Sequence, residues 1–124
     1  MRRIILTGVI ILSLSLVLFS PKISAATVEI NMVADQYYFD PDVIKVKRGD
    51  KLIINIESLM SEMENFPLHG IFFPALNKRW DLPTGKTTTI EFVVDLPPGE
   101  YPFECDIYCG LAHPDMKGVL IVEE

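Results

Sequence analysis

The chain contains 124 residues, of which seventeen are acidic and eleven basic, and it carries a formal net charge of −6. This length suffices for one domain of ordinary size. The acidic balance, without a basic stripe, excludes nucleic acid as a partner, because binding to phosphates requires clustered Lys and Arg side chains. The same negative charge favours encounter with a basic partner protein, and the alternative is that it only keeps the protein soluble.

The first 26 residues have the composition of an export signal. Their three charged side chains are all basic (Arg2, Arg3 and Lys22), and residues 4–19 form an almost uninterrupted apolar run. The small residues Ser24-Ala25-Ala26 then provide a cleavage site. We therefore expect cleavage after Ala26 and a mature domain of residues 27–124. In that domain eight basic residues stand against seventeen acidic ones, which gives a net charge of about −9.

An uncleaved membrane anchor is the alternative for the same segment. Its apolar run of 16 residues is just short of the roughly 17 that a spanning helix requires. Pro21 and the two alanines are more typical of signal processing than of an interfacial belt. Both alternatives place the rest of the chain outside the cytoplasm, in the periplasm or at the outer face of the cytoplasmic membrane. The second adds membrane association through the N-terminal segment.

From Thr27 onward the sequence is organised as short strands. Residues 27–34 alternate in polarity and place four apolar side chains on one face: Val28, Ile30, Met32 and Ala34. Further strands are expected at residues 43–46, 51–58, 87–95, 100–105 and 117–124, with turns at Gly49-Asp50 and Pro97-Pro98-Gly99. Short strands about ten residues apart predict an all-β sandwich or barrel. Residues 58–70, which are acidic and rich in methionine, are the exception, and one helical turn is considered there.

The stretch from Cys105 to Met116 concentrates soft metal donors. It holds the only two cysteines of the chain, one of its two histidines and one of its five methionines, in the order C-x3-C-x3-H-x2-M: Cys105, Cys109, His113 and Met116. Thiolate and thioether sulfur select copper, zinc or iron-sulfur centres, and imidazole suits zinc, copper, iron and nickel. The shared preference of these donors favours copper. Zinc remains open, although methionine is an unusual ligand for it.

This spacing resembles, residue for residue, the binuclear copper (CuA) loop of cytochrome c oxidase subunit II and of nitrous oxide reductase. The resemblance implies that the sulfurs of Cys105 and Cys109 bridge two copper ions and that His113 caps one of them. It also implies that Met116 is a weak sulfur ligand and that the main-chain carbonyl of Ile107 is a ligand of the second copper. Many oxidase subunits carry Glu where this chain has Ile107, a difference that matters little for a backbone ligand.

The resemblance also requires a second histidine from an earlier strand, and His69 is the candidate. The segment that follows it is similar to the oxidase segment in which the histidine precedes a small residue, an aromatic, a proline, a lysine and an acid-x-Pro-Gly-like turn. Here one residue is inserted before the Pro-x-Gly, and the matching residues are Gly70, Phe72 or Phe73, Pro74, Lys78, Asp81, Pro83 and Gly85. The resemblance covers the chain from about residue 33 onward.

The family implies a cupredoxin-like Greek-key β-sandwich or barrel that carries single electrons between a donor, such as a c-type cytochrome or another cupredoxin, and an acceptor. No candidate catalytic acid, base or open substrate site is evident, so we expect no turnover by this chain alone. One alternative is the non-catalytic electron-entry subunit II of a haem-copper cytochrome c oxidase, with subunit I as partner. Another is a copper-delivery protein with a labile mononuclear site. Asp106 and Asp115 either orient a docking partner or are simply solvated.

Two other arrangements of the cysteines compete with the binuclear site. A disulfide between Cys105 and Cys109 would be ordinary in an exported protein, but it would close a very short loop and so stabilise little. A mononuclear blue copper site could use His69, Cys109, His113 and Met116. That set leaves Cys105 without a role, and blue-copper loops usually place the histidine two or four residues after the cysteine. The second cysteine favours the binuclear centre.

Three further features carry alternatives. Met60 and Met63 precede His69 and suggest either a copper(I) uptake site or flexible packing. Residues 37–39 (Tyr-Tyr-Phe) are similar to the aromatic cluster through which oxidase subunits receive electrons, whereas core packing under the adjacent turn is the simpler role. For Trp80 the same two roles, electron entry and core packing, are the alternatives.

Overall fold

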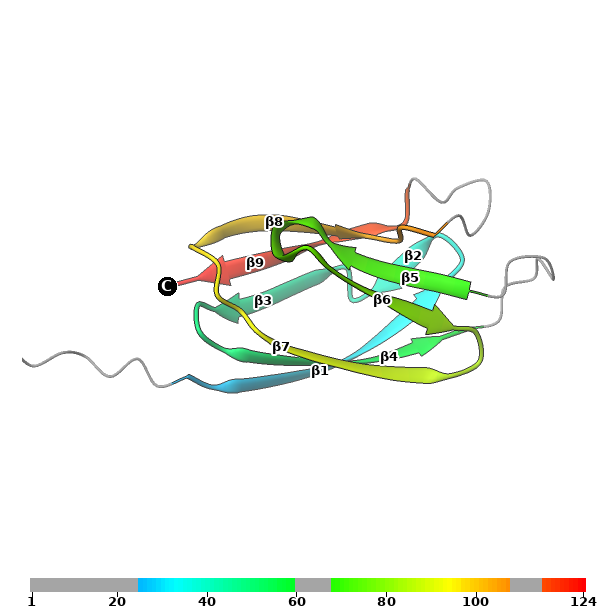
Figure 1. The fold of residues 1–124 in the computed structure, drawn as a ribbon, viewed down its shortest axis with the longest axis horizontal. Coiled ribbons are helices and arrows are strands. Elements are labelled where there is room, and N and C mark those ends of the chain that lie inside the picture. The colour runs from blue at the N-terminus through cyan, green and yellow to red at the C-terminus, as the bar shows by residue number, and fades with distance from the viewer. Residues whose placement is uncertain (1–24, 60–67, 108–114) are drawn as a thin grey trace, which may run out of the picture.

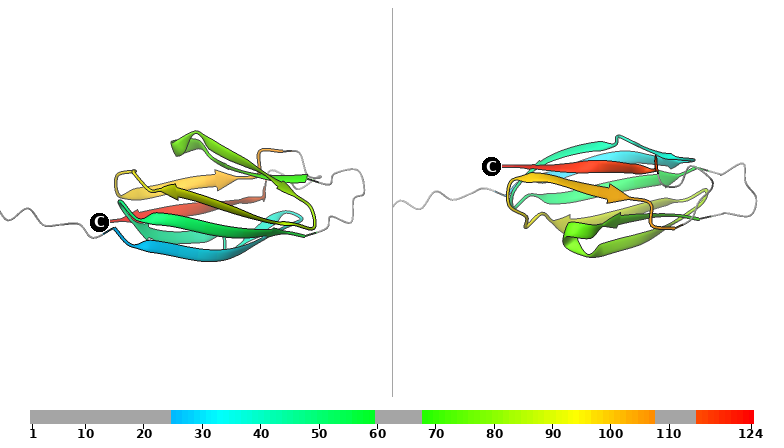
Figure 2. Two further views of the ribbon diagram at one scale, coloured as in Figure 1. Left: turned by 60° about the horizontal axis from the view of Figure 1, so that its bottom comes forward. Right: turned by 90° about the horizontal axis from the view of Figure 1, so that it is seen from above.

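Two β-sheets packed face to face form the protein, as a computed structural model describes it over residues 25–59, 68–107 and 115–124 (Figures 1 and 2). The first sheet has the strand order β2-β1-β4-β7, and the second has the order β3-β9-β8-β5-β6. The strands within these residues are β1 (Thr27–Asp35), β2 (Tyr38–Asp40), β3 (Val43–Lys47), β4 (Lys51–Ser58), β5 (Leu68–Phe73), β6 (Lys78–Pro83), β7 (Thr87–Val93), β8 (Gly99–Glu104) and β9 (Lys117–Glu123), with a short 3₁₀ helix, η1 (Pro74–Leu76).

The strands predicted from the alternation of polarity are present. In β1 the apolar face predicted from residues 28 to 34 lies against the core, with Met32 and Ala34 fully covered. The turn predicted at Gly49-Asp50 is also confirmed, because Gly49 has φ of 89° and so adopts the left-handed conformation that glycine tolerates. The structure adds β2, β5 and β6, which the strand pattern did not predict.

The core lies between the two sheets and contains a connected group of aromatic side chains. Phe103 packs against Phe39 and Phe73 with ring centroids 5.4 and 5.2 Å apart. Phe73 and Trp80 both contact Phe92, so the group joins the two sheets across the sandwich. Protein interiors of this kind pack like organic crystals and resist deformation. Strand ends that emerge from such a core have well-defined positions.

One end of the sandwich collects the strand termini on which the predicted ligands depend. β8 ends there, β9 and β5 begin there, and the C-terminus lies at the opposite end (Figure 1). β8 and β9 are antiparallel neighbours, and β5 pairs with β8 on the other side. The chain direction in the second sheet therefore brings the residue after β8, the residue before β9 and the first residues of β5 to one edge.

Some of the sequence-based expectations concern residues outside the described part of the chain. These are the export signal or anchor, which falls almost entirely within residues 1–24, the helical turn considered for residues 58–70, and Met60 and Met63. At the ends of the range 58–70, Ser58 is the last residue of β4 and residues 68–70 belong to β5. The domain boundary after Ala26 stays a prediction. Within the described ranges no helix has both the length and the apolar character needed to span a bilayer.

Asp50 fastens the turn between β3 and β4. Its side chain is 5% exposed, and its two carboxylate oxygens accept hydrogen bonds from the backbone N–H of Lys47 at 2.9 Å and of Ala26 at 3.2 Å. The Ala26 carbonyl also accepts from the N–H of Lys51 at 2.9 Å. A buried carboxylate in this position therefore satisfies two backbone donors that no sheet ladder would satisfy.

We expect Asp50→Ala in the full-length chain to lower the free energy of unfolding by about 1–3 kcal/mol, because the part-buried backbone N–H groups of Lys47 and Ala26 would lose a charged acceptor. Asp95→Ala is the matched control: its carboxylate is 85% exposed and is paired with Arg48 at 3.6 Å, so its loss should cost less than about 1 kcal/mol. Urea unfolding of both variants measures the difference. Equal losses of stability would contradict the role assigned to Asp50.

Candidate metal centre

Cys105 and Met116 lie at the base of the loop that the sequence assigns to the metal. The β8–β9 ladder ends with Glu104 opposite Lys117, and one further hydrogen bond runs from the N–H of Cys105 to the carbonyl of Met116, at 3.0 Å. The side chains of both residues are almost completely buried, with 3% and 1% exposed. Two of the predicted sulfur ligands are therefore held by backbone pairing at the edge of the core.

The sulfur of Cys105 also meets the predicted carbonyl ligand. Its Sγ donates a hydrogen bond to the backbone oxygen of Ile107 at 3.2 Å. A thiol and a carbonyl two residues apart thus point into the same volume. Because a thiol that binds a metal gives up its proton, this contact would be replaced by bonds from both groups to the metal.

His69 lies in β5 and is fully buried. β5 pairs with β8 through Phe72 and Glu104, and this antiparallel register, if continued past the end of β8, would set His69 opposite Ile107. Gly70 confirms how closely these segments approach. A Cβ atom placed on it would lie 2.5 Å from Asp106 Oδ1 and 3.1 Å from Ile107 Cδ1. The strand that carries His69 therefore lies against the segment that follows Cys105.

Four of the six predicted ligand residues are described, and they gather at one end of the sandwich. They are His69, Cys105, Ile107 and Met116, whereas Cys109 and His113 lie outside the described residues. Within the described ranges no three His, Cys, Asp or Glu side chains form a group that could hold a metal. The donors that are present are two buried sulfurs, a buried imidazole and the carbonyl of a half-buried residue, and this set of donors suits copper.

Arg79 is a residue near the candidate centre that the sequence did not single out. From β6 its Nε donates to Asp106 Oδ2 at 2.6 Å, and its second guanidinium nitrogen donates to Asp81 Oδ1 at 3.0 Å. The hydrogen bond and the charge of Asp106 raise the pKa of Arg79 above its ordinary value. Asp106 was expected either to orient a partner or to be simply solvated. Its carboxylate is instead paired with Arg79, 27 residues away in sequence.

The aromatic residues of the β1–β2 turn divide between core and surface. Phe39 is 2% exposed and packs edge-on against Phe103, which confirms the core-packing role for this residue. Tyr38 is 48% exposed and its hydroxyl donates to Asp35 Oδ2 at 3.1 Å, a contact that raises the pKa of Tyr38. Trp80 packs against Phe73 and stacks on Phe92, as expected for a core role.

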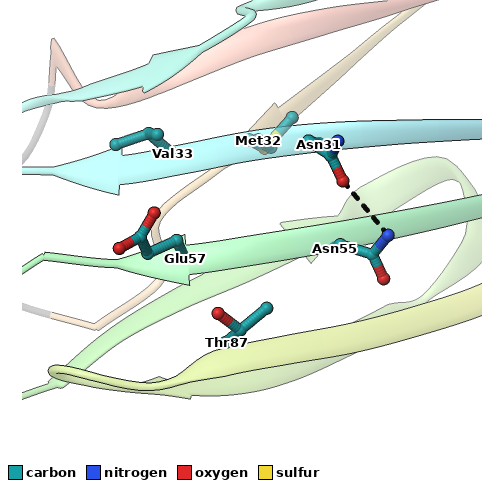
Figure 3. Close-up of a pocket in the computed structure, with 6 residues that line it drawn as sticks. All are labelled: Asn31, Met32, Val33, Asn55, Glu57 and Thr87. Carbon is teal, nitrogen blue, oxygen red and sulfur yellow. Dashed lines mark hydrogen bonds between the residues drawn. The ribbon is translucent and has the colours of Figure 1, made fainter.

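A pocket on the outer face of the first sheet is separate from these ligands. It is lined by Asn31, Met32, Val33, Asn55, Glu57 and Thr87, and Figure 3 shows their side chains along β1, β4 and β7. Asn55 Nδ2 donates to Asn31 Oδ1 at 3.2 Å within it. None of the residues predicted to bind copper lines this pocket, so it does not belong to the candidate centre.

Comparison with known proteins identifies the family to which this fold belongs. A model of the cupredoxin-like domain family matches residues 8–122. The chain belongs to the cupredoxin-like family. It is 28% identical to cytochrome c oxidase subunit 2 of Thermus thermophilus over 93 residues, which cover 75% of this chain and 64% of that protein. Against a second subunit 2 sequence from the same species the covered share is 51%, so this cupredoxin spans between about half and two thirds of the length of these relatives.

Solved structures show the same relation. A haem-copper terminal oxidase superposes with a TM-score of 0.66 at 25% identity, covering 83% of this chain and 68% of the other. The periplasmic domain of cytochrome oxidase subunit II from Bradyrhizobium japonicum superposes with a TM-score of 0.61 at 16% identity, covering 77% of this chain and 83% of that domain. Auracyanin A, a blue copper protein from Chloroflexus aurantiacus, superposes with a TM-score of 0.59 at 17% identity, covering 78% of this chain and 99% of auracyanin A. The last two show the fold alone, and this cupredoxin thus has a copper-protein fold related to oxidase subunit II.

The burial of Met116 generates a prediction for the metal-free protein. Met116→Ala should lower the free energy of unfolding by about 2–5 kcal/mol, because it leaves a cavity at the base of the loop. Met116→Leu keeps the volume and should cost less than about 1.5 kcal/mol. Val93→Ala, at a side chain that is 58% exposed, is the control and should change stability little. A Met116→Ala variant as stable as the control in urea unfolding would refute this packing role.

Proposed function

We propose that this cupredoxin is an exported electron carrier with a binuclear CuA-type copper centre. Its ligands would be His69, Cys105, Ile107, Cys109, His113 and Met116. The observation that carries the proposal is the contact of the Cys105 sulfur with the Ile107 carbonyl, at 3.2 Å, beside the buried Met116. The C-x3-C-x3-H-x2-M spacing and the family membership support the same conclusion.

Each residue would have a defined part in holding the metal. The thiolates of Cys105 and Cys109 would bridge, the imidazoles of His69 and His113 would each cap one side, and the thioether of Met116 would be a weak ligand that tunes the potential rather than holds the metal. Such a centre supplies one-electron redox chemistry when bound. The protein contributes a buried, apolar setting and strand ends that keep these donors in place, so that little has to move when an electron arrives or leaves.

The proposed setting is extracytoplasmic, with residues 27–124 as the electron-transfer domain and residues 1–26 as a cleaved signal or a membrane anchor. The redox donor would be a c-type cytochrome or another cupredoxin. The net charge of the chain supports a basic partner surface. The domain would perform no catalysis by itself, because the ligands proposed above leave no open position for a substrate.

A second candidate is the electron-entry subunit of a haem-copper oxidase, with subunit I as its partner. The similarity to oxidase subunit 2 in sequence, and to a haem-copper terminal oxidase in structure, supports it. We expect the full-length chain, expressed with an affinity tag in its native host, to co-purify with a haem-containing subunit if it acts there. Recovery of the chain alone from a membrane extract that retains active oxidase would exclude this candidate and leave the free carrier.

The bridging role of the cysteines predicts that replacing either one removes copper and the native optical spectrum. Cys105→Ser and Cys109→Ser should each abolish the native optical spectrum and reduce the copper content below two ions per chain, because a serine hydroxyl is a poor bridge between soft metal ions. Copper analysis of the loaded full-length chain, together with its visible spectrum, measures both effects.

Met116→Leu is the matched control, because a weak axial ligand affects the potential more than the affinity. This variant should keep both copper ions and show a changed reduction potential. Retention of two coppers with an unchanged spectrum in either cysteine variant would show that the bridging assignment is wrong.

A further inference from the structure

Arg79 joins β6 to the first arm of the candidate metal loop through a two-pronged contact. Its Nε lies 2.6 Å from Asp106 Oδ2, and the adjacent guanidinium nitrogen lies 3.4 Å from Asp106 Oδ1. Both carboxylate oxygens of Asp106 thus face one guanidinium, which is the arrangement in which arginine fixes orientation as well as distance. The Asp106 side chain is 21% exposed and that of Arg79 is 48% exposed, so only the Asp106 side of the pair is shielded from water.

Asp81 completes this arrangement from the other side. It accepts from the same terminal nitrogen of Arg79 at 3.0 Å, and it is paired with Gly70 in the register between β5 and β6. Gly70 leaves room for the Asp106 carboxylate, which would lie 2.5 Å from any Cβ added there. The three charged side chains therefore form a latch, Asp81–Arg79–Asp106, that lies over Gly70 of β5.

The position of the latch relates it to the proposed ligands. Asp106 stands between Cys105 and Ile107, whose sulfur and carbonyl are in contact, and Gly70 directly follows His69 in β5. The latch thus connects β6 to the segment that carries two proposed ligands, and β6 is the paired neighbour of β5, the strand that carries a third. Interactions outside the ligand set that fix the segment carrying a ligand can orient that ligand and tune the site.

We propose that the Asp81–Arg79–Asp106 latch is a positioning device that fixes the Cys105–Ile107 segment relative to His69, and thereby sets the reduction potential of the bound copper centre. The part that concerns copper rests on the function proposed above. Arg79 acts through Asp106 and contacts none of the proposed ligands among the described residues. The competing explanation is an ordinary surface ion pair, which would contribute only to stability.

Arg79→Gln and Asp106→Asn remove the ionic contact from either side while keeping side chains of similar shape. Arg48→Gln is the matched control: it removes the same charge by breaking the Arg48–Asp95 pair, 3.6 Å long, at the turn between β3 and β4. Arg79→Lys keeps the charge but loses the planar fork, so it separates an electrostatic effect from a positioning effect.

In the copper-free full-length chain the readout is amide hydrogen exchange at Cys105, whose N–H bonds to the Met116 carbonyl. We expect Arg79→Gln and Asp106→Asn to accelerate exchange in residues 105–107 several-fold, because local opening becomes easier, whereas Arg48→Gln leaves it unchanged. Unchanged exchange in both latch variants would overturn the positioning role whether or not copper binds.

In the copper-loaded chain the readouts are the reduction potential and the visible spectrum. We expect both latch variants to shift the potential and the spectrum in the same direction, and the double variant to shift them no further than either single one. Arg79→Lys should give values between those of Arg79→Gln and the wild type. Values equal to wild type in both single variants would overturn the effect on potential. Failure of the wild-type chain to bind two coppers would instead refute the proposed function, and the exchange experiment would still decide whether the latch holds the loop.

Discussion

The pairing of β8 with β9 is the constraint on which the candidate centre depends. It runs in register to Glu104 and Lys117, and the hydrogen bond from Cys105 to Met116 adds one more rung beyond the strands. Two sulfur donors that are eleven positions apart in sequence are thereby brought to the base of one loop. β8 and β9 are themselves held by β5 and β3, their outer neighbours in the sheet. The pairing of these strands therefore fixes where the two donors lie.

The rest of the sandwich gives this edge its rigidity. The aromatic side chains that connect Phe39 to Phe92 through Phe103 and Phe73 fill the space between the sheets. β5, which carries His69, belongs to the same packed layer, and the Arg79 latch ties its paired neighbour β6 to the segment after Cys105. A densely packed scaffold changes little when a ligand or charge is added, which is the property that an electron carrier requires.

The sequence predicted those parts of the fold that have a local pattern. Strands with clear alternation or runs of β-branched residues, such as β1, β4 and β7, were predicted. β6 was missed because it begins with Lys78 and Arg79, and its position depends on pairing with β5. The donors of the loop were recognisable because they lie within one short motif. His69 was found only through the family resemblance, and the Arg79–Asp106 contact could not be found, because the two residues are far apart in sequence and meet only through the register of the second sheet.

The measurement that tests the central claim most directly is the copper content of the purified, copper-loaded full-length chain together with its electron paramagnetic resonance spectrum. An unpaired electron shared equally by two copper nuclei gives a seven-line hyperfine pattern, whereas one confined to a single nucleus gives four lines. The account predicts two copper ions per chain and the seven-line pattern. One copper with a four-line pattern, or no retained copper, would contradict it and indicate a mononuclear carrier or a copper-delivery protein.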